Sequence, residues 1–325
     1  MNNTTIANRT LPHQDAVSET KMKQLNIPMN DLLDIWLETK KICVKPSTLA
    51  QYRRIVRKTL KPEFDGLTTR TVSSDTLRAM AEALLDKYSA VTTQMVMTVT
   101  NQILQFMCEN GYADKKPQAK IRFSKHYKRP EILTITEQRR LTNFLLDDMN
   151  LSKMGILLCL YTGLRVGELC GLQWKDIDMT SKIIRVKRTV QRISDGSGHT
   201  YFLIGTTKTE HSEREIPLPT FLINLIKDFE PQNKSFYVTS GSENFTQPRT
   251  YQNRFKRYLK ECNVSEYHFH TLRHTFASRA IELGFDAKSL SEILGHSDVK
   301  ITLALYVHPS LEQKRREMEL FSSII

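Results

Sequence analysis

The sequence predicts a mainly α-helical protein with a small antiparallel β-sheet, built as two domains. Apolar residues recur at helical spacing through most of the chain. β-branched residues gather within residues 183–218, which favours strands there. Residues 114–130 are rich in positive charge, contain two prolines and have no apolar period, which is typical of a linker between domains.

The first domain is predicted over residues 27–113, after a flexible polar tail at residues 1–26. Apolar residues at helical spacing predict four helices and no strand, so this domain is expected to be all-α. The predicted helices begin near Asn30, Ser47, Ser74 and Thr92, with Asn30 and Ser47 as N-caps, and Gly111 ends the last one.

A basic face lies on the second of these helices. Its apolar stripe is separate from its positive residues, which suits a helix that packs on one side and contacts a DNA backbone on the other. A solvated surface is an equally supported alternative for this helix alone. The positive residues are Arg53, Arg54, Arg57 and Lys58.

The second domain is predicted over residues 131–325. It begins with a helix capped by Thr136, and a small antiparallel sheet interrupts an otherwise helical pattern. Helices are predicted at residues 153–161 and 167–172, strands at 183–193, 201–205 and 214–218, and further helices from residue 219 onward.

The composition favours a nucleic-acid partner over a membrane. The chain has 325 residues, a net charge of +12 and a pI of about 9.4, which favour a polyanion. No apolar run is long enough to span a membrane, and the N-terminus is polar rather than signal-like. The five cysteines are scattered, so neither disulfides nor a zinc cluster are expected and a cytoplasmic location fits.

Three segments of the second domain carry candidate chemistry, and the first spans residues 162–169. Gly163 permits a sharp turn that would place Arg165 at the start of a helix, where free N–H groups and partial positive charge favour an anion. Glu168 lies three residues further on the same helical side and could orient the guanidinium. A purely structural Arg–Glu pair is the alternative.

The second segment contains Lys208, which is predicted to lie in a turn between two strands. A lysine there could donate a proton to a leaving oxygen, although most turn lysines are simply solvated.

The third segment contains His270, Arg273 and His274 at a helix start, then Leu294-Gly295-His296, then Tyr306 on a short helix. Arginine and histidine donors can hold a phosphate, and a tyrosine hydroxyl can attack it. Tyr306 lies on an apolar stripe, so a place in the core is the alternative.

These segments together resemble the tyrosine recombinase, or phage integrase, family. Its signatures are T-G-x-R-x-x-E-L, a β-hairpin lysine, H-x-x-R-H, L-G-H and a tyrosine. They match Thr162 to Leu169, Lys208 before Ser212-x-Arg214-x-Ile216-Pro217, His270 to His274, Leu294 to His296, and Tyr306. The resemblance implies a SAM-like core-binding domain at residues 27–113 and a mixed α+β catalytic domain at residues 131–325.

The resemblance also implies a mechanism of DNA cutting and rejoining. Arg165, Arg273 and His296 would hold the scissile phosphate, and Tyr306 would attack it to form a 3′-phosphotyrosyl link. Lys208 would protonate the departing 5′-oxygen, and His270 would act as acid or base near the nucleophile. His274 matches the motif, but packing or a supporting hydrogen bond is its expected role. Because the covalent link conserves the bond energy, no cofactor and no metal is expected.

The implied product is a recombined pair of double-stranded DNAs, reached through a Holliday junction, for integration or excision of a mobile element. The family assembles as a homotetramer on two duplexes, and the apolar C-terminal tail resembles the helix that packs into a neighbouring subunit. An accessory DNA-bending or excision factor is a further expected partner. Two alternatives stay open at this point: a type IB topoisomerase-like enzyme, and a DNA-binding protein without catalysis.

Overall fold

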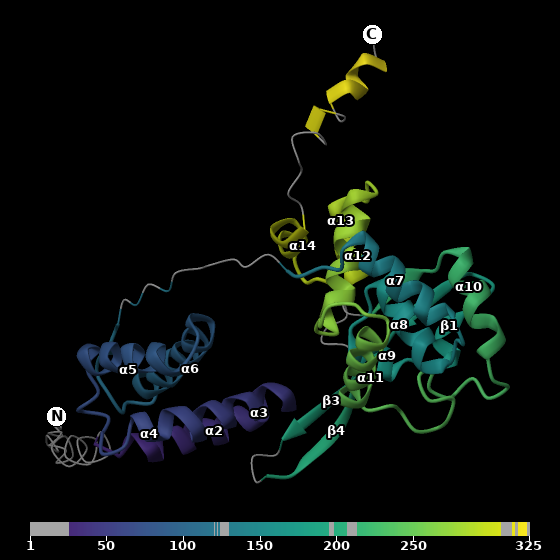
Figure 1. The fold of residues 1–325 in the computed structure, drawn as a ribbon. Coiled ribbons are helices and arrows are strands. Elements are labelled where there is room, and N and C mark those ends of the chain that lie inside the picture. The colour runs from purple at the N-terminus through teal and green to yellow at the C-terminus, as the bar shows by residue number, and fades with distance from the viewer. Residues whose placement is uncertain are drawn as a thin grey trace, which may run out of the picture. The chain divides into compact units, whose positions relative to one another are not determined.

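The computed structural model of the chain describes residues 26–119, 121, 123, 130–194, 198–206, 213–306, 314, 315 and 318–323. The chain forms two compact units, residues 1–126 with 193–201 and residues 127–192 with 202–325 (Figure 1). Almost all of the predicted tail at 1–26, and much of the predicted linker at 114–130, lie outside the described residues.

Residues 26–119 of the first unit are helical, and their apolar side chains form one core. Trp36, Leu60, Leu84 and Ile103 are fully buried in it. The helices are α2 (Met29–Cys43), α3 (Pro46–Ile55), a π-helical turn (Val56–Leu60), α4 (Lys61–Glu63), α5 (Ser74–Lys87) and α6 (Ala90–Glu109).

Two of the expected caps in this unit are wrong. Helix α3 has Lys45 as its N-cap and Pro46 at its first position, rather than Ser47 as N-cap. Proline suits the first helical position because its φ is already helical and that position has no use for an N–H donor. Helix α2 likewise begins at Met29, one residue before the expected cap at Asn30.

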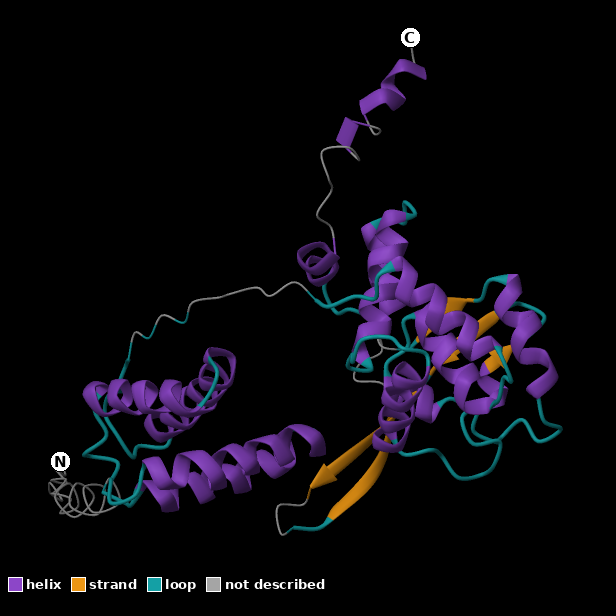
Figure 2. Ribbon diagram, viewed as in Figure 1, coloured by secondary structure: helices purple, strands orange, loops and turns teal. Residues whose placement is uncertain are grey.

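The second unit is mainly helical and contains one small sheet, and a separate pair of strands extends from it (Figure 2). Its helices are α7 (Ile135–Leu146), α8 (Leu151–Thr162), α9 (Val166–Gly171), α10 (Thr220–Ile226), α11 (Pro248–Glu261), α12 (His270–Glu282), α13 (Ala287–Leu294) and α14 (Val299–Tyr306), with 3-10 turns at Trp174–Asp176, Lys227–Phe229 and Leu320–Ser323. Its own strands are β1 (Ile177–Asp178), β2 (Ile183–Val186) and β5 (Arg214–Pro217). Strands β3 (Arg188–Ser194) and β4 (Thr200–Thr206) begin or end within residues 193–201, which belong to the first unit.

The predicted single sheet is divided into two sheets. Strands β1, β2 and β5 form an antiparallel sheet in which Ile184 pairs with Ile177 on one side and with Ile216 on the other. These three isoleucines are buried in the core of the unit. Strands β3 and β4 pair separately, because the predicted strand at residues 183–193 is broken between Val186 and Arg188.

Helix α12 is held in place by contacts with two earlier segments of this unit. It packs along α8, and the segment before α7 is bound to it by a hydrogen bond from the Leu133 N–H to Thr275 Oγ1 at 3.0 Å. Thr134 caps α7 in a capping box with Glu137, so the expected cap at Thr136 is two residues too late. Helix α12 carries His270, Arg273 and His274, and its fixed position therefore determines where these side chains lie.

All five cysteines are free thiols. No described helix is both long enough and apolar enough to cross a membrane.

Gly163, which ends α8, should tolerate a side chain far less well than Gly284, which follows α12. Both have positive φ angles, 69° and 91°. A Cβ on Gly163 would lie 2.7 Å from Phe276 and 2.8 Å from Leu294, whereas a Cβ on Gly284 would meet nothing within 4 Å. We expect Gly163→Ala to lower the free energy of unfolding by about 2–4 kcal/mol, from strain and overpacking together. Gly284→Ala should lower it by only about 1–2 kcal/mol.

Urea unfolding of the full chain, followed by circular dichroism, measures both effects. Equal losses in the two variants would contradict the close packing of Gly163.

Candidate active site

Gly163 and Arg165 form the turn that joins α8 to α9. Gly163 ends α8 in the left-handed conformation that glycine adopts without strain. Arg165 then occupies the N-cap position of α9. The predicted sharp turn is therefore present, and it places Arg165 at the start of a helix.

Glu168 binds Arg165 in two ways. Its carboxylate accepts the backbone N–H of Arg165 at 2.9 Å and a guanidinium N–H at 2.8 Å. The carboxylate side chain is only 5% exposed, so this pair is largely shielded from water on one side. The spacing of three residues that suggested this contact therefore produces a capping interaction as well as an ion pair.

A second arginine, Arg214 at the start of β5, also binds Glu168. Its two terminal nitrogens donate to the two carboxylate oxygens at 3.0 and 2.8 Å, which is the bidentate geometry of strong Arg–carboxylate pairs. Burial of Glu168 opposes its ionisation. Hydrogen bonds and charge from Arg214, together with Arg165, outweigh that effect and lower the pKa of Glu168 to about 2.

The carbonyl end of α13 accepts hydrogen bonds from three arginines. Arg214 Nε donates to the Ile293 carbonyl at 2.6 Å. Arg273 donates to the Leu294 carbonyl at 2.6 Å, and Arg165 donates to the Leu294 and Gly295 carbonyls, both at 3.3 Å. These carbonyls carry the negative end of the helix dipole, so cations are favoured there.

Arg273 is the most deeply buried of these cations, at 1% exposure. It also donates to the Gly163 carbonyl at 2.8 Å, which links α12 to the turn before α9. Burial, and then repulsion from Arg165, lower the pKa of Arg273 to about 9, so it stays charged at neutral pH. With two guanidinium N–H groups engaged by carbonyls, further donors remain to bind an anion.

His296 follows Gly295, the C-cap of α13, and is half-buried. Its Nδ1 lies 2.8 Å from the hydroxyl of Thr302, a fully buried residue of α14. Burial and the charges of Arg273 and Arg165 lower the pKa of His296 to about 4. His296 is therefore neutral at pH 7 in the free protein.

His270 and His274 lie one turn apart on α12, with their ring centroids 4.6 Å apart in an edge-to-face arrangement. His270 is exposed as a whole, yet partial burial of its ring, followed by repulsion from His274 and Arg273, lowers its pKa to about 4. Burial and Arg273 also lower the pKa of His274.

Tyr306 ends α14 and is 8% exposed. Its ring belongs to a small apolar cluster with Ala277, Ala280, Leu290 and Leu294. Its hydroxyl lies 2.6 Å from Nδ1 of His274. Burial raises the pKa of Tyr306, while Arg273 and Arg165 act in the opposite direction, so both cations lie near enough to affect the phenol.

The structure brings together most of the residues singled out in the sequence. Arg165, Glu168, His270, Arg273, His274, His296 and Tyr306 interact by contacts or by charge. Lys208 lies outside the described residues. Arg53 and Arg54 lie on α3 of the first unit, and Arg57 and Lys58 on the π-helical turn after it.

Two residues of the site had no role assigned from the sequence. Arg214 stands in the Arg214-x-Ile216-Pro217 tract, so its motif was visible but its partner Glu168 was not. Thr302 is a lone polar residue between apolar neighbours, and this is the only signal of its contact with His296. Among the described residues, no cluster of His, Cys, Asp or Glu side chains could hold a metal ion.

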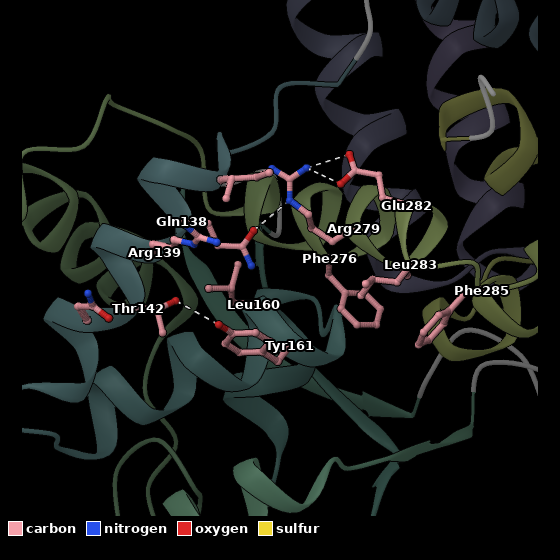
Figure 3. Close-up of a pocket in the computed structure, with 13 residues that line it drawn as sticks. Gln138, Arg139, Thr142, Leu160, Tyr161, Phe276, Arg279, Glu282, Leu283 and Phe285 are labelled. Atoms are coloured by element: carbon pink, nitrogen blue, oxygen red, sulfur yellow. Dashed lines mark hydrogen bonds and ion pairs between the residues drawn. The ribbon is translucent and has the colours of Figure 1, made fainter. Parts of the chain in front are cut away.

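A separate apolar groove lies between α7, α8 and α12 (Figure 3). Its volume is about 460 Å³, and Tyr161, Phe276, Leu283 and Phe285 contribute apolar surface. Leu283 is 79% exposed and Phe285 45%, so this surface has no cover within the described chain. Arg279, bound to Glu282 at 2.8 and 2.7 Å, forms a polar margin.

Family models cover most of the chain. A model described as the phage integrase family matches residues 131–313, and a model described as the phage integrase N-terminal SAM-like domain matches residues 29–78.

Individual relatives agree with these matches. A XerC-like tyrosine recombinase of Caldanaerobacter subterraneus is 26% identical, with 92% of this chain and 84% of the relative aligned. The integrase of Staphylococcus phage L54a is 25% identical, with 93% and 94% aligned.

Solved structures share the fold. The Tn1549 transposon integrase in complex with a circular intermediate DNA superimposes with a TM-score of 0.75 at 22% identity, over 91% of this chain and 99% of that one. A lambda integrase tetramer bound to a Holliday junction superimposes with a TM-score of 0.65 at 18% identity, over 90% and 81%.

Replacing Glu168 by Gln should destabilise the protein strongly, because two arginines would lose their common carboxylate. Breaking a buried ion pair from one side costs about 3–5 kcal/mol, so we expect the free energy of unfolding to fall by about 3 kcal/mol. The matched control is Glu215→Gln. Glu215 pairs with Arg185 on the same sheet but is 59% exposed, and its loss should cost under about 1 kcal/mol.

The loss should also depend on pH. Because folding lowers the pKa of Glu168 to about 2, its contribution is complete above the ordinary value of 4.5 and disappears as pH falls toward 2. Urea unfolding at pH 7 and at pH 3 measures this change. A difference between wild type and Glu168→Gln that does not shrink at pH 3 would contradict the ion-pair account.

Proposed function

The chain belongs to the phage integrase family, and from this premise we propose that it is a site-specific recombinase that integrates or excises a mobile DNA element. The proposed reaction cuts and rejoins DNA through a 3′-phosphotyrosyl intermediate and a Holliday junction. The observation that carries the proposal is the grouping of Arg165 and Arg273 at the carbonyl of Leu294, whose side chain shares an apolar cluster with Tyr306.

In this proposal the scissile phosphate binds Arg165, Arg273 and His296. Two guanidinium groups offer fixed pairs of donors to the non-bridging oxygens, and they counter the charge that builds up in the transition state. His296 adds one hydrogen bond, and its Nδ1 contact with Thr302 holds its ring in place. Glu168 orients Arg165 through a hydrogen bond, so the guanidinium group is already in position when an anion binds.

Tyr306 is the proposed nucleophile, and Lys208 the proposed acid for the departing 5′-oxygen. His270 is proposed to assist near the nucleophile, and its contact with Tyr306 runs through His274. His274 supports Tyr306 through a direct hydrogen bond. A 5′-hydroxyl from the partner duplex then displaces Tyr306 and restores the phosphodiester.

Double-stranded DNA is the proposed partner of both units. The net charge of +12 supports this, because phosphate neutralisation dominates the affinity of proteins for DNA. In the first unit, Arg54, Arg57 and Lys58 are exposed, and with Arg53 they are proposed to contact the DNA backbone.

The proposed active assembly is a homotetramer in which the C-terminal segment of one subunit binds the apolar groove of the next. Two exposed apolar surfaces of this chain support the proposal. Met318 and Phe321 in the C-terminal segment are 66% and 61% exposed, and the groove exposes Leu283 and Phe285. Phe276 lines the groove and lies beside Gly163. A segment bound in the groove would therefore contact a side chain that packs against the turn before Arg165.

Tyr306→Phe should bind DNA as wild type does and form no covalent adduct, because only the attacking oxygen is removed. The substrates are duplexes taken from the DNA that surrounds the gene, each with a nick that traps the cleaved state. The covalent adduct is then measured on denaturing gels. Sequencing the trapped DNA also identifies the cleaved site. Tyr88→Phe, at an exposed position of the first unit, is the matched control and should retain full activity. Adduct formation by Tyr306→Phe would overturn the assignment of the nucleophile.

Removing the residues after 311 should leave DNA binding by single subunits intact and prevent tetramer formation. A milder variant with Met318→Ser and Phe321→Ser should act the same way, because it removes only the apolar contact. Val91→Ser, at a position of α6 that is 72% exposed, serves as control. Light scattering on DNA and a strand-exchange assay report the outcome. Normal tetramers and normal recombination by the truncated chain would contradict the exchange.

A further inference from the structure

His274 makes the direct contact with the hydroxyl group that the proposed function assigns as nucleophile. Its Nδ1 lies 2.6 Å from the Tyr306 hydroxyl oxygen, well within hydrogen-bond distance. The two rings are tilted by 48° with centroids 5.8 Å apart. His274 belongs to α12 and Tyr306 ends α14, and the two helices also share an apolar cluster that contains Ala277 and Tyr306.

Tyr306 must lose a proton before it can attack phosphorus. Burial raises the pKa of its hydroxyl, so it is protonated at neutral pH despite the nearby cations. Burial and Arg273 lower the pKa of His274, so its imidazole is neutral under the same conditions and has one nitrogen able to accept a proton. A neutral base and a protonated nucleophile therefore already share a hydrogen bond.

The other histidines are placed less well for this step. His296 directs its Nδ1 to Thr302, at 2.8 Å. His270 meets the ring of His274, with centroids 4.6 Å apart, rather than the phenol. The direct contact therefore distinguishes His274 from its neighbours.

We propose that His274 is the general base of DNA strand cleavage and removes the proton of Tyr306, an inference that rests on the proposed function. As the Tyr306 O–H bond breaks, the proton passes to Nδ1 of His274. The phenolic oxygen forms a bond to phosphorus, and the bond from phosphorus to the 5′-oxygen breaks. The 5′-oxygen takes its proton from a separate acid, Lys208 in the proposed function. The reverse transfer returns the proton to Tyr306 during rejoining.

The surrounding charges link this base to substrate binding. His270, Arg273 and Tyr306 face His274, and Arg165 acts on Tyr306 from α9. In the free protein, Arg273 disfavours a second positive charge on His274. A bound phosphate offsets that cation, so the imidazole becomes a stronger base when the substrate is in place. His274 is thus expected to act when DNA is bound.

The test measures the single-turnover rate of adduct formation. Its substrate is the duplex that contains the cleavage site identified with the wild-type enzyme. His274→Ala should slow this step by about 10²–10⁴-fold, the usual contribution of a general base. His274→Gln should be similarly slow, because its amide can hydrogen-bond to Tyr306 but cannot take the proton. His268→Ala, at an exposed histidine two positions before His270, should keep the wild-type rate. DNA affinity and thermal unfolding are measured for each variant.

Three further readouts separate a base from a purely structural residue. Imidazole in the buffer should restore at least part of the rate of His274→Ala. The rate of that variant should rise with pH over the range where the wild-type rate is level, because the phenol must then ionise unaided. A 5′-bridging phosphorothiolate, whose sulfur leaves without a proton, should not rescue the variant, because leaving-group protonation is not its defect.

Several outcomes would overturn the role of His274. One is a wild-type rate of adduct formation for His274→Gln. Another is a rate of His274→Ala that follows the wild-type pH profile and is not restored by imidazole. The third is full rescue of His274→Ala by the phosphorothiolate substrate. If the wild-type enzyme forms no adduct through Tyr306, the proposed function fails and this role fails with it.

Discussion

One carboxylate and the carbonyl end of one helix hold three arginines together, and the candidate site depends on this arrangement. Glu168 binds Arg165 and Arg214, and the last carbonyls of α13 accept from Arg165, Arg214 and Arg273. A close ion pair near a protein surface is worth about 4 kcal/mol before desolvation, whereas a cation at a helix end gains about 0.3–1 kcal/mol. Glu168 therefore supplies most of the energy that offsets burial of the arginines, and the carbonyls at the helix end determine how the guanidinium groups are oriented. One carboxylate cannot neutralise three guanidinium groups, and in the proposed function the remaining positive charge binds the scissile phosphate.

The same helix end also determines where Tyr306, the proposed nucleophile, lies. Gly295 follows α13 with a φ of 63°, and a Cβ there would lie 3.1 Å from a guanidinium nitrogen of Arg214, so a glycine permits the close approach. His296 comes next and is tied to Thr302 of α14, and Tyr306 ends that helix. The arginines and Tyr306 are therefore connected through a short, well-anchored stretch of chain. A displacement of α13 would disturb the three arginines and Tyr306 together.

Much of this arrangement was accessible from the sequence, because it depends on local spacing. The helices, the turn at Gly163 and the Arg165–Glu168 contact follow from short-range patterns. The grouping of motif residues from distant segments was implied by the family resemblance. The missed features depend on pairing between distant segments. Arg214 reaches Glu168 across 46 positions and the Ile293 carbonyl across 79, and no local pattern encodes either contact. His274 was expected to pack or to support, because its spacing gave no sign that Tyr306, 32 residues later, would bind its ring. The division of the sheet at residue 187 was missed because a run of β-branched residues does not reveal where one strand changes its partner.

A double-mutant cycle between Glu168→Gln and Arg214→Gln tests the shared-carboxylate account most directly. Each single change leaves a charge without its partner, whereas the double change removes both charges. If the account is right, urea unfolding gives a double variant less destabilised than the sum of the single variants, with a coupling energy of about 2 kcal/mol or more. Losses that add to within about 0.5 kcal/mol would contradict it, because Glu168 and Arg214 would then act independently.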